Sequence, residues 1–529
     1  MGRHAAGDSF FRGYLAHSKQ DTISAFVTDP RHGETFKELL VSAGDKRSVE
    51  IVDKTSLGTL TDSVLYYPGP DIAGQAFNRS LLGNSAFSLS GVTHTTASAG
   101  VMDSLCELIT APVQPWDAVI CTSSAVKTNV ETLLQGQVDY LRDRLGISKL
   151  TLPKFPVIPL GIHTADFRVA EEAKRIARQV LGISDKDVVV LFLGRLSFHA
   201  KAHPLAMYQA LEAAAKSVPN GGKVVLIECG WFANDWIREA FEEASSQACP
   251  SIKVIRLDGR VMATRDQAWA SADVFCSFSD NIQETFGLSP VEAMAAGLPV
   301  VVSDWNGYKE TVRDGIDGFR IPTLMPSAGL GGDLAYRHAL GIDTYDVYCG
   351  YASSFVSVDI EAATKAFSQL FSSPDLRAKM GQSGQKRATE VYDWKQIIPQ
   401  YEALWEELGT IRAAARQSSN QSPSVWPART DPYKLFANYP TSTLTPDTEI
   451  ALGPAAVNDS SWTTLSKLRM VAFSKPVLAS DEEIDQLIDQ LKTGPKIANS
   501  LLIHYTTERQ AIVFRTITFL TKLGVIRAM

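Results

Sequence analysis

Residues 280–299 read Asp280-Asn-Ile-Gln-Glu284-Thr-Phe-Gly287-Leu-Ser289-Pro-Val-Glu292-Ala-Met-Ala-Ala-Gly297-Leu-Pro299, and the apolar run Val300-Val-Val302 follows them. This order indicates a loop, then a helix, then a buried strand. Ser289 is a residue type that caps helix N-termini, and Glu292, three positions later, completes a capping box. A proline after the serine fits the first helical position, and the glycine and proline at 297 and 299 end a helix. These signals predict a helix over Pro290–Ala296.

The start of this predicted helix is a candidate anion site. Gly287 and Leu288 place free backbone amides at an N-terminus, where about half a positive charge favours phosphate. Glu292 fits two interpretations: a capping residue that needs no ligand, or a residue that contacts one. Glu284 should repel phosphate, so we expect its carboxylate to face another group, such as sugar hydroxyls.

A second candidate anion site follows the strand expected at Val188–Leu193. Gly194-Arg195 comes directly after that strand, and Lys201 lies six residues beyond Arg195. Ligands of open α/β sheets bind beyond the carboxyl ends of the strands, which is where these two cations should lie. Two cations can neutralise a diphosphate without a metal ion. The alternative is that both side chains belong to a solvated surface loop.

Taken together, these residues resemble glycosyltransferase family 4, the group 1 glycosyltransferases. The resemblance rests on Gly194-Arg195-Leu196 with Lys201, and on Glu284 and Glu292 with Phe286-Gly287 between them. Weaker echoes are Val92-Thr-His94-Thr, Asp117-Ala-Val-Ile-Cys-Thr-Ser123 and Val157-Ile-Pro-Leu-Gly161-Ile-His163. The chain departs from the family at His163, where an acidic residue is common, and in a long insertion near 323–358. These departures bear on the acceptor more than on the reaction.

The resemblance implies an α/β protein of the GT-B type, with two Rossmann-like domains facing across a cleft. It implies a retaining, metal-independent hexosyltransferase that moves a sugar from a nucleotide-diphosphate donor to a glycan or lipid-linked acceptor, as in polysaccharide biosynthesis. No cofactor is expected, because the nucleotide sugar is a substrate. A peripheral contact with a membrane, the oligomeric state, the donor base and the sugar are left open. The alternatives are a sugar phosphorylase of the same fold and a non-catalytic sugar-binding relative.

The resemblance also assigns roles to residues. Arg195 and Lys201 would hold the diphosphate, Glu292 the ribose hydroxyls, and Glu284 the transferred sugar. His94 would lie near the reacting carbon, although an interior histidine with satisfied hydrogen bonds is the alternative. The expected catalytic residues are Glu284, His94, Arg195 and Lys201. The expected donor-binding residues are Arg195, Lys201, Val261, Phe286, Gly287, Leu288, Glu292 and Gly7.

Alternating β-branched runs and amphipathic stretches predict parallel sheets with crossover helices. The predicted parts are an acceptor domain at 1–165, a donor domain at 166–391, a crossover helix at 392–410, a linker at 411–430 and a mainly helical module at 431–529. The expected strands of the first domain are Thr22–Val27, Ser48–Val52, Ser63–Tyr67, Phe87–Val92, Asp117–Cys121 and Phe155–Leu160. Those of the second are Val188–Leu193, Lys223–Glu228, Ile252–Leu257, Val274–Ser277 and Pro299–Ser303.

The first domain should contain one more strand than the sequence offers. Gly2–Ser9, with Gly7, resembles the turn that follows the first strand of a doubly wound domain, and Phe10–His17 resembles the helix after it. Only Met1 precedes that turn. We therefore expect a start codon placed too far downstream, or a fragment, and the alternative is a sheet that lacks this strand.

Composition narrows the class of protein. A chain of 529 residues exceeds the roughly 250–300 residues at which single cores stop growing. Its net charge is −7, and from residue 431 onward ten Lys or Arg face ten Asp or Glu, so we expect no nucleic-acid partner. A packing or oligomerisation role is favoured for that module, although its ending faintly resembles a winged helix. Six scattered cysteines and no apolar run of about 20 residues favour a cytoplasmic protein.

Overall fold

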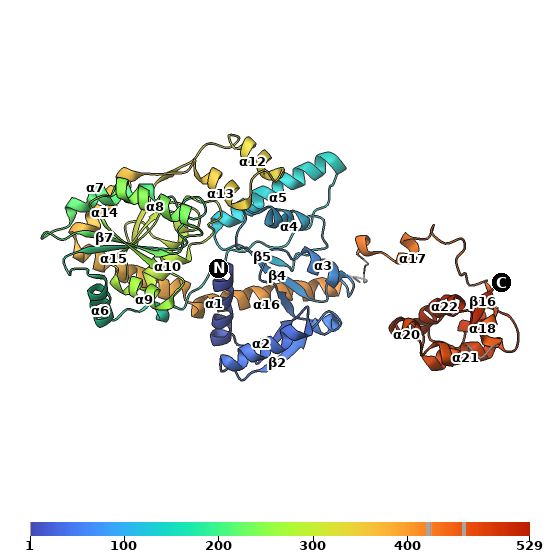
Figure 1. The fold of residues 1–529 in the computed structure, drawn as a ribbon. Coiled ribbons are helices and arrows are strands. Elements are labelled where there is room, and N and C mark those ends of the chain that lie inside the picture. The colour runs from blue at the N-terminus through green and yellow to red at the C-terminus, as the bar shows by residue number, and fades with distance from the viewer. Residues whose placement is uncertain (1, 419–423, 425, 458–461) are drawn as a thin grey trace. The chain divides into compact units, whose positions relative to one another are not determined.

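The computed structural model describes residues 2–418, 424, 426–457 and 462–529. These residues form two compact units, which divide between Trp426 and Pro427. The first unit contains both α/β domains and a long helix that connects them (Figure 1). The second unit is a small domain of its own. The division lies four residues before the predicted start of the C-terminal module.

The second α/β domain is built on a six-stranded parallel sheet in the order β11-β10-β9-β6-β7-β8. The strands are β6 (Val188–Leu193), β7 (Val224–Gly230), β8 (Lys253–Asp258), β9 (Val274–Ser277), β10 (Val300–Ser303) and β11 (Gly318–Ile321). The order reverses beside β6, which starts the domain and pairs with both β7 and β9. The five predicted strands are confirmed within two residues at each end.

Helices cover both faces of this sheet, because successive side chains of each strand point to opposite sides. Val188 and Val190 of β6 pack in one apolar core, and Val189 and Leu191 pack in the other. The helices are α6 (Glu171–Leu181), α7 (Leu205–Ala214), α8 (Asp235–Ala248), α9 (Met262–Ser271), α10 (Leu288–Ala295), α11 (Tyr308–Thr311), α14 (Ile360–Ser372) and α15 (Pro374–Arg387). A strand buried on both faces explains the unbroken apolar run of β6.

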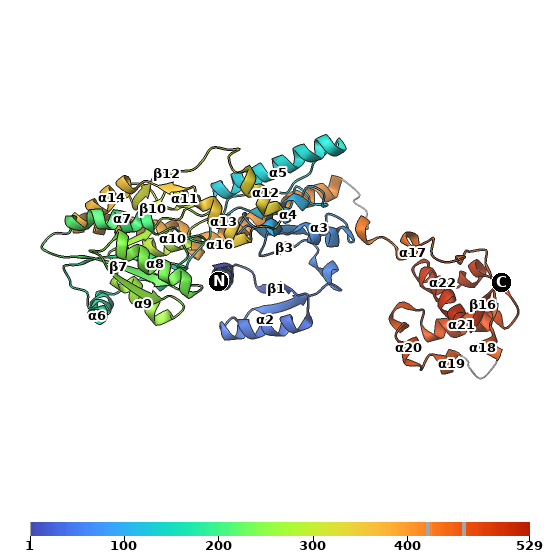
Figure 2. The same ribbon diagram turned by 45° about the horizontal axis from the view of Figure 1, so that its top comes forward.

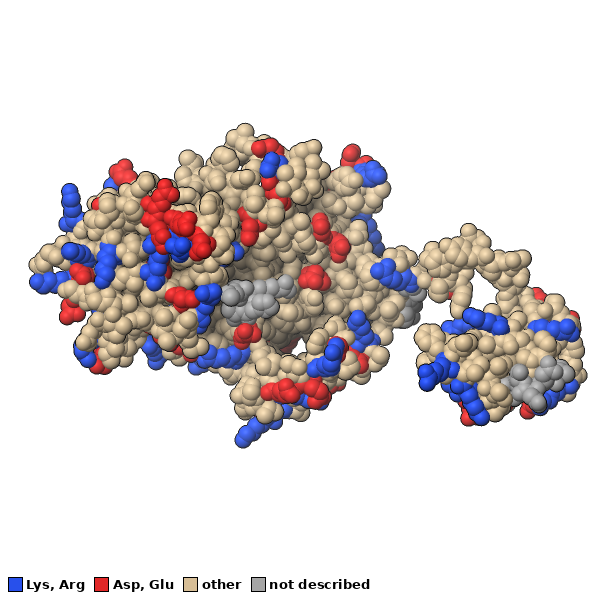
Figure 3. Space-filling model, in the orientation of Figure 1, with Lys and Arg blue, Asp and Glu red and all other residues tan. Residues whose placement is uncertain are grey.

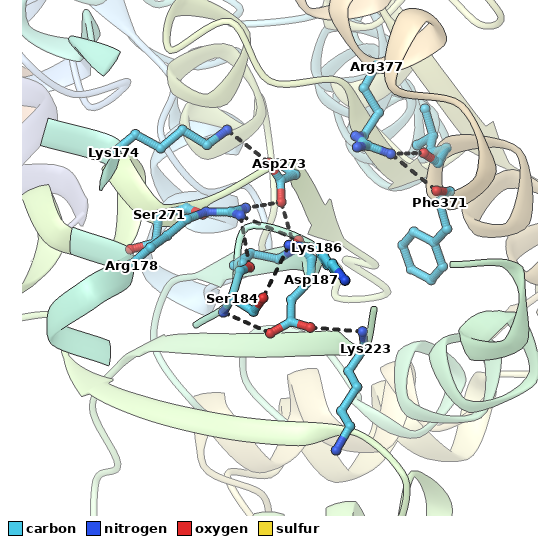
Figure 4. Close-up of polar contacts among 12 residues, drawn as sticks. Lys174, Arg178, Ser184, Lys186, Asp187, Lys223, Ser271, Asp273, Phe371 and Arg377 are labelled. Atoms are coloured by element: carbon cyan, nitrogen blue, oxygen red, sulfur yellow. Dashed lines mark hydrogen bonds and ion pairs between the residues drawn. The ribbon is translucent and has the colours of Figure 1, made fainter. Parts of the chain in front are cut away.

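A polar cluster fastens α6 to the amino ends of the strands (Figure 4). The Asp273 carboxylate accepts hydrogen bonds from the Val189 amide at 2.9 Å, from Lys174 Nζ at 2.8 Å, and from the guanidinium of Arg178. Asp187 likewise accepts the backbone N–H of Lys223 at 2.9 Å. At this end of the sheet, Lys174 and Arg178 are therefore paired with the Asp273 carboxylate. The candidate site lies at the opposite end, beyond the carboxyl ends of the strands.

The first α/β domain contains two separate parallel sheets among its described residues, β1-β2 and β3-β4-β5. Figure 2 shows β1 and α2 set apart from β3. The elements are α1 (Gly2–His17), β1 (Thr22–Phe26), α2 (Pro30–Ser42), β2 (Ser48–Val52), β3 (Val64–Tyr66), α3 (Ala73–Ser80), β4 (Ser88–Val92), α4 (Ala99–Glu107), β5 (Ala118–Ile120) and α5 (Ser124–Leu145). The sixth predicted strand, Phe155–Leu160, is wrong, since this region adds only isolated bridges next to β5.

The N-terminal turn predicted at Gly2–Ser9 is also wrong, because these residues are the first half of helix α1. Gly7 is an exposed helical residue with open space where a side chain would begin. A glycine costs only about 1 kcal/mol inside a helix, so its presence does not require a turn. Whether a strand precedes this helix in the natural protein stays a prediction.

The insertion near 323–358 contains regular structure. Strands β12 (Thr323–Leu324) and β13 (Ser357–Val358) form a short antiparallel pair. Helices α12 (Gly332–Ala339) and α13 (Tyr345–Ser353) lie between them in sequence. Thr344 caps α13 by accepting the backbone N–H of Val347. The Gly329–Gly332 cluster obscured these helices, because glycine is a poor helix former.

Helix α16 (Trp394–Ser418) crosses from the second domain onto the first and runs eight residues beyond the predicted end at 410. Arg412, only 2% exposed, donates hydrogen bonds to the Ser63 carbonyl at 2.5 Å and to Ser88 Oγ at 2.9 Å. Leu408 is the last buried apolar residue of α16, so apolar periodicity ends before the helix does. The predicted linker at 411–430 is therefore helical at its start, and its residues 419–423 and 425 lie outside the described residues.

The second unit contains a three-stranded antiparallel sheet in the order β15-β14-β16 as well as helices. Its elements are α17 (Pro432–Leu435), β14 (Glu449–Leu452), α18 (Pro454–Val457), α19 (Trp462–Leu465), α20 (Arg469–Ala472), α21 (Asp481–Leu491), β15 (Lys496–Ile497), α22 (Thr507–Lys522) and β16 (Ile526–Ala528). Ile484 and Leu487 of α21 and Ile517 of α22 are fully buried in the apolar core of this unit.

Trp394, at the start of α16, joins the two α/β domains. It is 1% exposed, and its indole Nε1 donates to Ser9 Oγ at 2.8 Å. A side-chain carbon added at Gly13 or Gly161 would lie 2.5 Å from its ring. We expect Trp394→Ala to destabilise the first unit by about 3–5 kcal/mol, the usual cost of emptying such a site.

Urea unfolding followed by circular dichroism measures this effect. The matched control is Trp236→Ala, because Trp236 is 65% exposed and its loss should change stability by less than about 1 kcal/mol. Equal unfolding midpoints for the two variants would contradict the role of Trp394.

Candidate active site

The site is centred on an ion pair between two loops at the carboxyl end of the six-stranded sheet. Lys201 Nζ lies 2.6 Å from Glu284 Oε2, and the side chains are 26% and 13% exposed. Lys201 comes from the loop after β6, and Glu284 from the loop after β9. Two strands adjacent in space thus bring together residues that lie 83 positions apart.

Both groups of this pair carry their charges. Burial opposes the charge on Lys201, but the neighbouring Glu284 carboxylate outweighs burial and raises the pKa of Lys201. Burial likewise opposes ionisation of Glu284, but Lys201 and the backbone amides of Thr285 and Phe286 hold the pKa of Glu284 below its ordinary value. A partly buried pair of this kind is expensive to break, because each charge needs the other.

The loops that carry the pair are fastened to each other. Asn281 donates its side-chain amide to the His199 carbonyl at 2.9 Å, and Gln283 donates to the Ala200 carbonyl at 2.6 Å. Arg195 also donates to the Ala200 carbonyl, at 2.7 Å, so it folds back over its own loop beside Lys201. The two predicted cations therefore lie close together at one rigid end of the sheet.

Helix α10 starts at Leu288, two residues earlier than the sequence predicted. Its N-cap residue is Gly287, with φ of 93°, and no side chain caps the helix. The predicted capping box of Ser289 and Glu292 is therefore wrong. A side-chain carbon at Gly287 would meet the Tyr308 ring at 2.0 Å, so both backbone conformation and packing require glycine here.

This correction leaves the Glu292 carboxylate available. It is not used as a cap, and no hydrogen bond from another described residue reaches it. Burial raises the pKa of Glu292 to about 7, although the cations Arg265 and Lys201 act in the opposite direction. An acid that is half protonated at neutral pH and lies next to an ion pair is a candidate ligand-binding group.

Three residues that follow β10 hold the loop that carries Glu284 in place. They were not predicted from the sequence. Asn306, with φ of 46°, donates its side-chain amide to the Glu284 carbonyl. Trp305 donates to the Asn281 carbonyl at 3.1 Å, and Tyr308 packs beneath Gly287. The Asn-Gly pair at 306–307 after a strand is a turn signal that could have drawn attention to this segment.

The first domain reaches the same loop. Ser123, the N-cap of α5, donates its hydroxyl to the Thr285 carbonyl at 2.8 Å. The next backbone N–H, of Ser124, donates to Glu310 Oε1 at 2.6 Å. A carboxylate at a helix N-terminus is favourable. The first domain therefore contacts Thr285, the residue directly after Glu284.

His94 lies at the carboxyl end of β4 and lines a cavity of about 390 Å³. Side chains from α1, β3 and α16 form the rest of the wall, and Gly7 also lines it. Beside His94, Thr95 Oγ1 lies 3.1 Å from the Tyr345 hydroxyl of the insertion. His94 is thus half-buried at a cavity of the first domain, and none of Arg195, Lys201, Glu284 and Glu292 lines that cavity. Its sugar-facing role stays a prediction.

The other predicted residues differ in what they can offer a ligand. Phe286 is 3% exposed and its ring packs against Tyr392, so only its backbone can contact a donor. Leu288 is the first residue of α10, so its backbone amide lies at the helix N-terminus, as the predicted phosphate site requires. The helix predicted from the sequence starts only after Leu288. Val261 is 48% exposed after β8 and precedes α9. Gly7 lies in a helix and not in a phosphate-binding turn.

Three other kinds of feature are absent from the described residues: a disulfide, a metal-binding cluster and a membrane-spanning helix. All six cysteines are free. Within the described ranges, no group of three or more His, Cys, Asp or Glu side chains could hold a metal ion. In the same residues, no helix is both long and apolar enough to cross a bilayer.

The family comparison agrees with this geometry. The family model described as "Glycosyl transferases group 1" matches residues 173–327, which contain Arg195, Lys201, Glu284 and Glu292. The second domain of this chain belongs to the group 1 glycosyl transferases. The resemblance predicted from the sequence is therefore confirmed. A group 1 domain preceded by another parallel α/β domain has the architecture of the GT-B fold, as predicted.

Individual relatives match parts of this chain. The phosphatidyl-myo-inositol mannosyltransferase of Mycobacterium leprae is 36% identical over 148 residues, which are 28% of this chain and 36% of that protein. The MMP alpha-(1->4)-mannosyltransferase of Mycolicibacterium hassiacum is 24% identical over 296 residues, 56% of this chain and 58% of that protein. The chain thus spans less than two thirds of the length of either relative.

Two solved structures align with a large part of this chain. Anabaena HepE in complex with UDP and glucose aligns with 79% of this chain and 96% of that chain, at 17% identity and a TM-score of 0.45. A glycosyltransferase from Rickettsia africae aligns with 74% of this chain and 99% of that chain, at 12% identity and a TM-score of 0.46.

Asp280 gives the glycosyltransferase domain a pH-dependent stability. It is 4% exposed, and burial raises its pKa to about 7. An acid whose pKa is raised by folding destabilises the fold progressively as pH rises from about 4 to 7, because the folded state resists losing the proton. Asp280→Asn removes that ionisation. The variant should gain stability over the wild type with rising pH, on the order of 4 kcal/mol at most, since each pKa unit of the shift corresponds to about 1.4 kcal/mol.

Thermal unfolding between pH 4.5 and 8 measures this gain. The advantage of the Asp280→Asn variant should be smallest at the acid end, grow as pH rises, and level off above about pH 7.5. A constant difference between the two proteins across this range would show that Asp280 ionises normally in the folded state.

Proposed function

We propose that the chain transfers a sugar from a nucleoside-diphosphate sugar to an acceptor hydroxyl, with retention at the anomeric carbon and without a metal ion. The observation that carries the proposal is the Lys201–Glu284 pair beside the free amide end of α10. Within the protein, the charge of Lys201 is neutralised by Glu284. A diphosphate at the α10 N-terminus would give that cation a second anionic partner.

Each group of the site has a task in this reaction. Arg195, Lys201 and the amides of Gly287 and Leu288 stabilise the negative charge that grows on the leaving diphosphate. The Glu284 carboxylate holds hydroxyls of the transferred sugar. Preorganised cations and amides need no reorganisation when the bond breaks, which is why such sites accelerate reactions strongly.

Glu292 supports a nucleotide donor over inorganic phosphate. A carboxylate without a protein partner, on the first turns of α10, is suited to accept hydrogen bonds from two ribose hydroxyls. A sugar phosphorylase would bind phosphate there, and a second carboxylate would oppose it. The two relatives named above are mannosyltransferases, so a mannosyl donor is the first to test.

Metal independence and retention extend the proposal. Two cations and a helix N-terminus can offset a diphosphate charge, which is the task a divalent ion performs elsewhere. For retention, the leaving phosphate oxygen accepts the proton of the acceptor hydroxyl on the face that it leaves. This route requires no carboxylate nucleophile. In this proposal, His94 of the first domain would face the transferred sugar.

Calorimetric titration with UDP, GDP and ADP in excess EDTA tests the donor class. We expect one of them to bind, and Lys201→Met to weaken its binding at least about tenfold, the cost of one charged hydrogen bond. Binding of inorganic phosphate and a sugar phosphate, but of no nucleotide, would instead favour the phosphorylase.

The same titrations at pH 6 and pH 8 test Glu292. Since the pKa of Glu292 is about 7 in the free protein, donor binding must release its proton at low pH. Affinity should fall by up to about tenfold per pH unit below 7. Glu292→Gln should lose this component. Ionisation of the terminal phosphate affects both proteins equally, so an identical pH dependence in the two would contradict the ribose contact.

Substitutions at the ion pair test catalysis. Glu284→Gln and Lys201→Met should each lower turnover by about 10²–10³-fold at saturating donor, the scale for losing one preorganised electrostatic contact. Lys174→Met is the matched control, since Lys174 also pairs with a carboxylate but lies at the opposite end of the sheet. Near wild-type turnover in either site variant would overturn its assigned role.

A further inference from the structure

The segment Ser466–Leu478 of the second unit exposes four large apolar side chains. Leu468, Met470, Phe473 and Val477 are 48%, 80%, 86% and 56% exposed. Isolated exposed apolar residues are ordinary, but four within ten positions are not. We call these four side chains, with Lys467, Arg469, Lys475 and Arg515, the Phe473 surface.

The backbone beneath this surface is held in place. Val471 of α20 is 2% exposed, and Trp462 of α19 is 4% exposed, both in the apolar core of the second unit. Ala479, just after the segment, donates its backbone N–H to Thr516 Oγ1 of α22 at 2.9 Å. The apolar side chains therefore project from an anchored segment, and their exposure is not the result of a missing core.

Cations surround the exposed apolar residues. Lys467, Arg469 and Lys475 lie within the segment, and Arg515 of α22 donates to the Val477 carbonyl at 2.6 Å. No Asp or Glu occurs between Trp462 and Ser480.

Most of this positive charge is uncompensated. Lys475 pairs with Asp481 at 3.0 Å. Among the described residues, Lys467, Arg469 and Arg515 have no carboxylate within ion-pair distance. Figure 3 shows lysine and arginine side chains on the side of the second unit where Figure 1 labels α20. The Phe473 surface is therefore cationic as well as apolar, although the second unit as a whole has no excess of positive charge.

We propose that the Phe473 surface docks the protein onto an anionic lipid bilayer. Highly exposed apolar tips flanked by Lys and Arg match the boundary between acyl chains and anionic headgroups. Met470 and Phe473 project from the surface, so they suit a soft apolar phase better than a partner that must supply a pocket. The contact would be peripheral. It does not depend on the proposed sugar transfer and can be tested without a donor.

Co-sedimentation of the full chain with vesicles tests this inference. The chain should bind vesicles of equimolar phosphatidylcholine and phosphatidylglycerol, and bind phosphatidylcholine alone weakly. High salt should weaken binding, because exposed charges are screened. Equal binding to both vesicles, or none to either, would overturn the proposal.

Paired variants locate the contact. Met470→Ser/Phe473→Ser should lower the vesicle partition coefficient at least about tenfold, since two large side chains no longer enter the bilayer. Tyr433→Ser/Tyr439→Ser is the apolar control, because these residues of the same unit are 69% and 78% exposed. Equal losses in the two double variants would contradict the assignment to the Phe473 surface.

The double variant Lys467→Glu/Arg469→Glu tests the electrostatic part of the contact and should abolish the preference for anionic vesicles. Lys492→Glu/Lys496→Glu is its control, with the same change in net charge elsewhere in the unit. Near-ultraviolet circular dichroism confirms that each variant folds. If instead the wild type self-associates and Met470→Ser/Phe473→Ser makes it monomeric without changing vesicle binding, the surface is a contact between copies and the proposal is wrong.

Discussion

The contact between Lys201 and Glu284 is the interaction on which the rest of the site depends. Neither charge is stable alone at its depth, so the loops that carry them must meet at a fixed distance. The parallel sheet provides this, because β6 and β9 are neighbours and end on the same side. The hydrogen bonds from Asn281 and Gln283 to the facing loop then remove the remaining freedom.

The same loop connects the chemistry to the first domain. Ser123 bonds the carbonyl of the residue next to Glu284, and Tyr345 of the insertion reaches the residue next to His94. Both contacts join the domains beside a predicted site residue. A shift between the domains would therefore move the loop that carries Glu284. This coupling gives a physical reason for placing a sugar-transfer site between two domains: closure can exclude water while positioning both substrates.

Sequence reasoning predicted the second domain well because its signals are local and strong. Long β-branched runs define β6 and β10, and the spacing of Lys201, Glu284 and Glu292 carries the family resemblance. It failed where tertiary contacts override local preference. Ser289 looks like a cap, but Tyr308 beneath Gly287 fixes the helix start two residues earlier. Asn306 and Ser123 donate to backbone carbonyls 22 and 162 positions away. A turn signal marks Asn306, but no local pattern reveals either partner.

The anomeric configuration of the first product tests the central claim most directly. Purified full-length protein, in EDTA, would be incubated with nucleotide sugars and a simple acceptor, and the new glycosidic bond followed by proton NMR. The account predicts turnover with the configuration of the donor preserved. An inverted product, or turnover that appears only when a divalent metal is added, would contradict it.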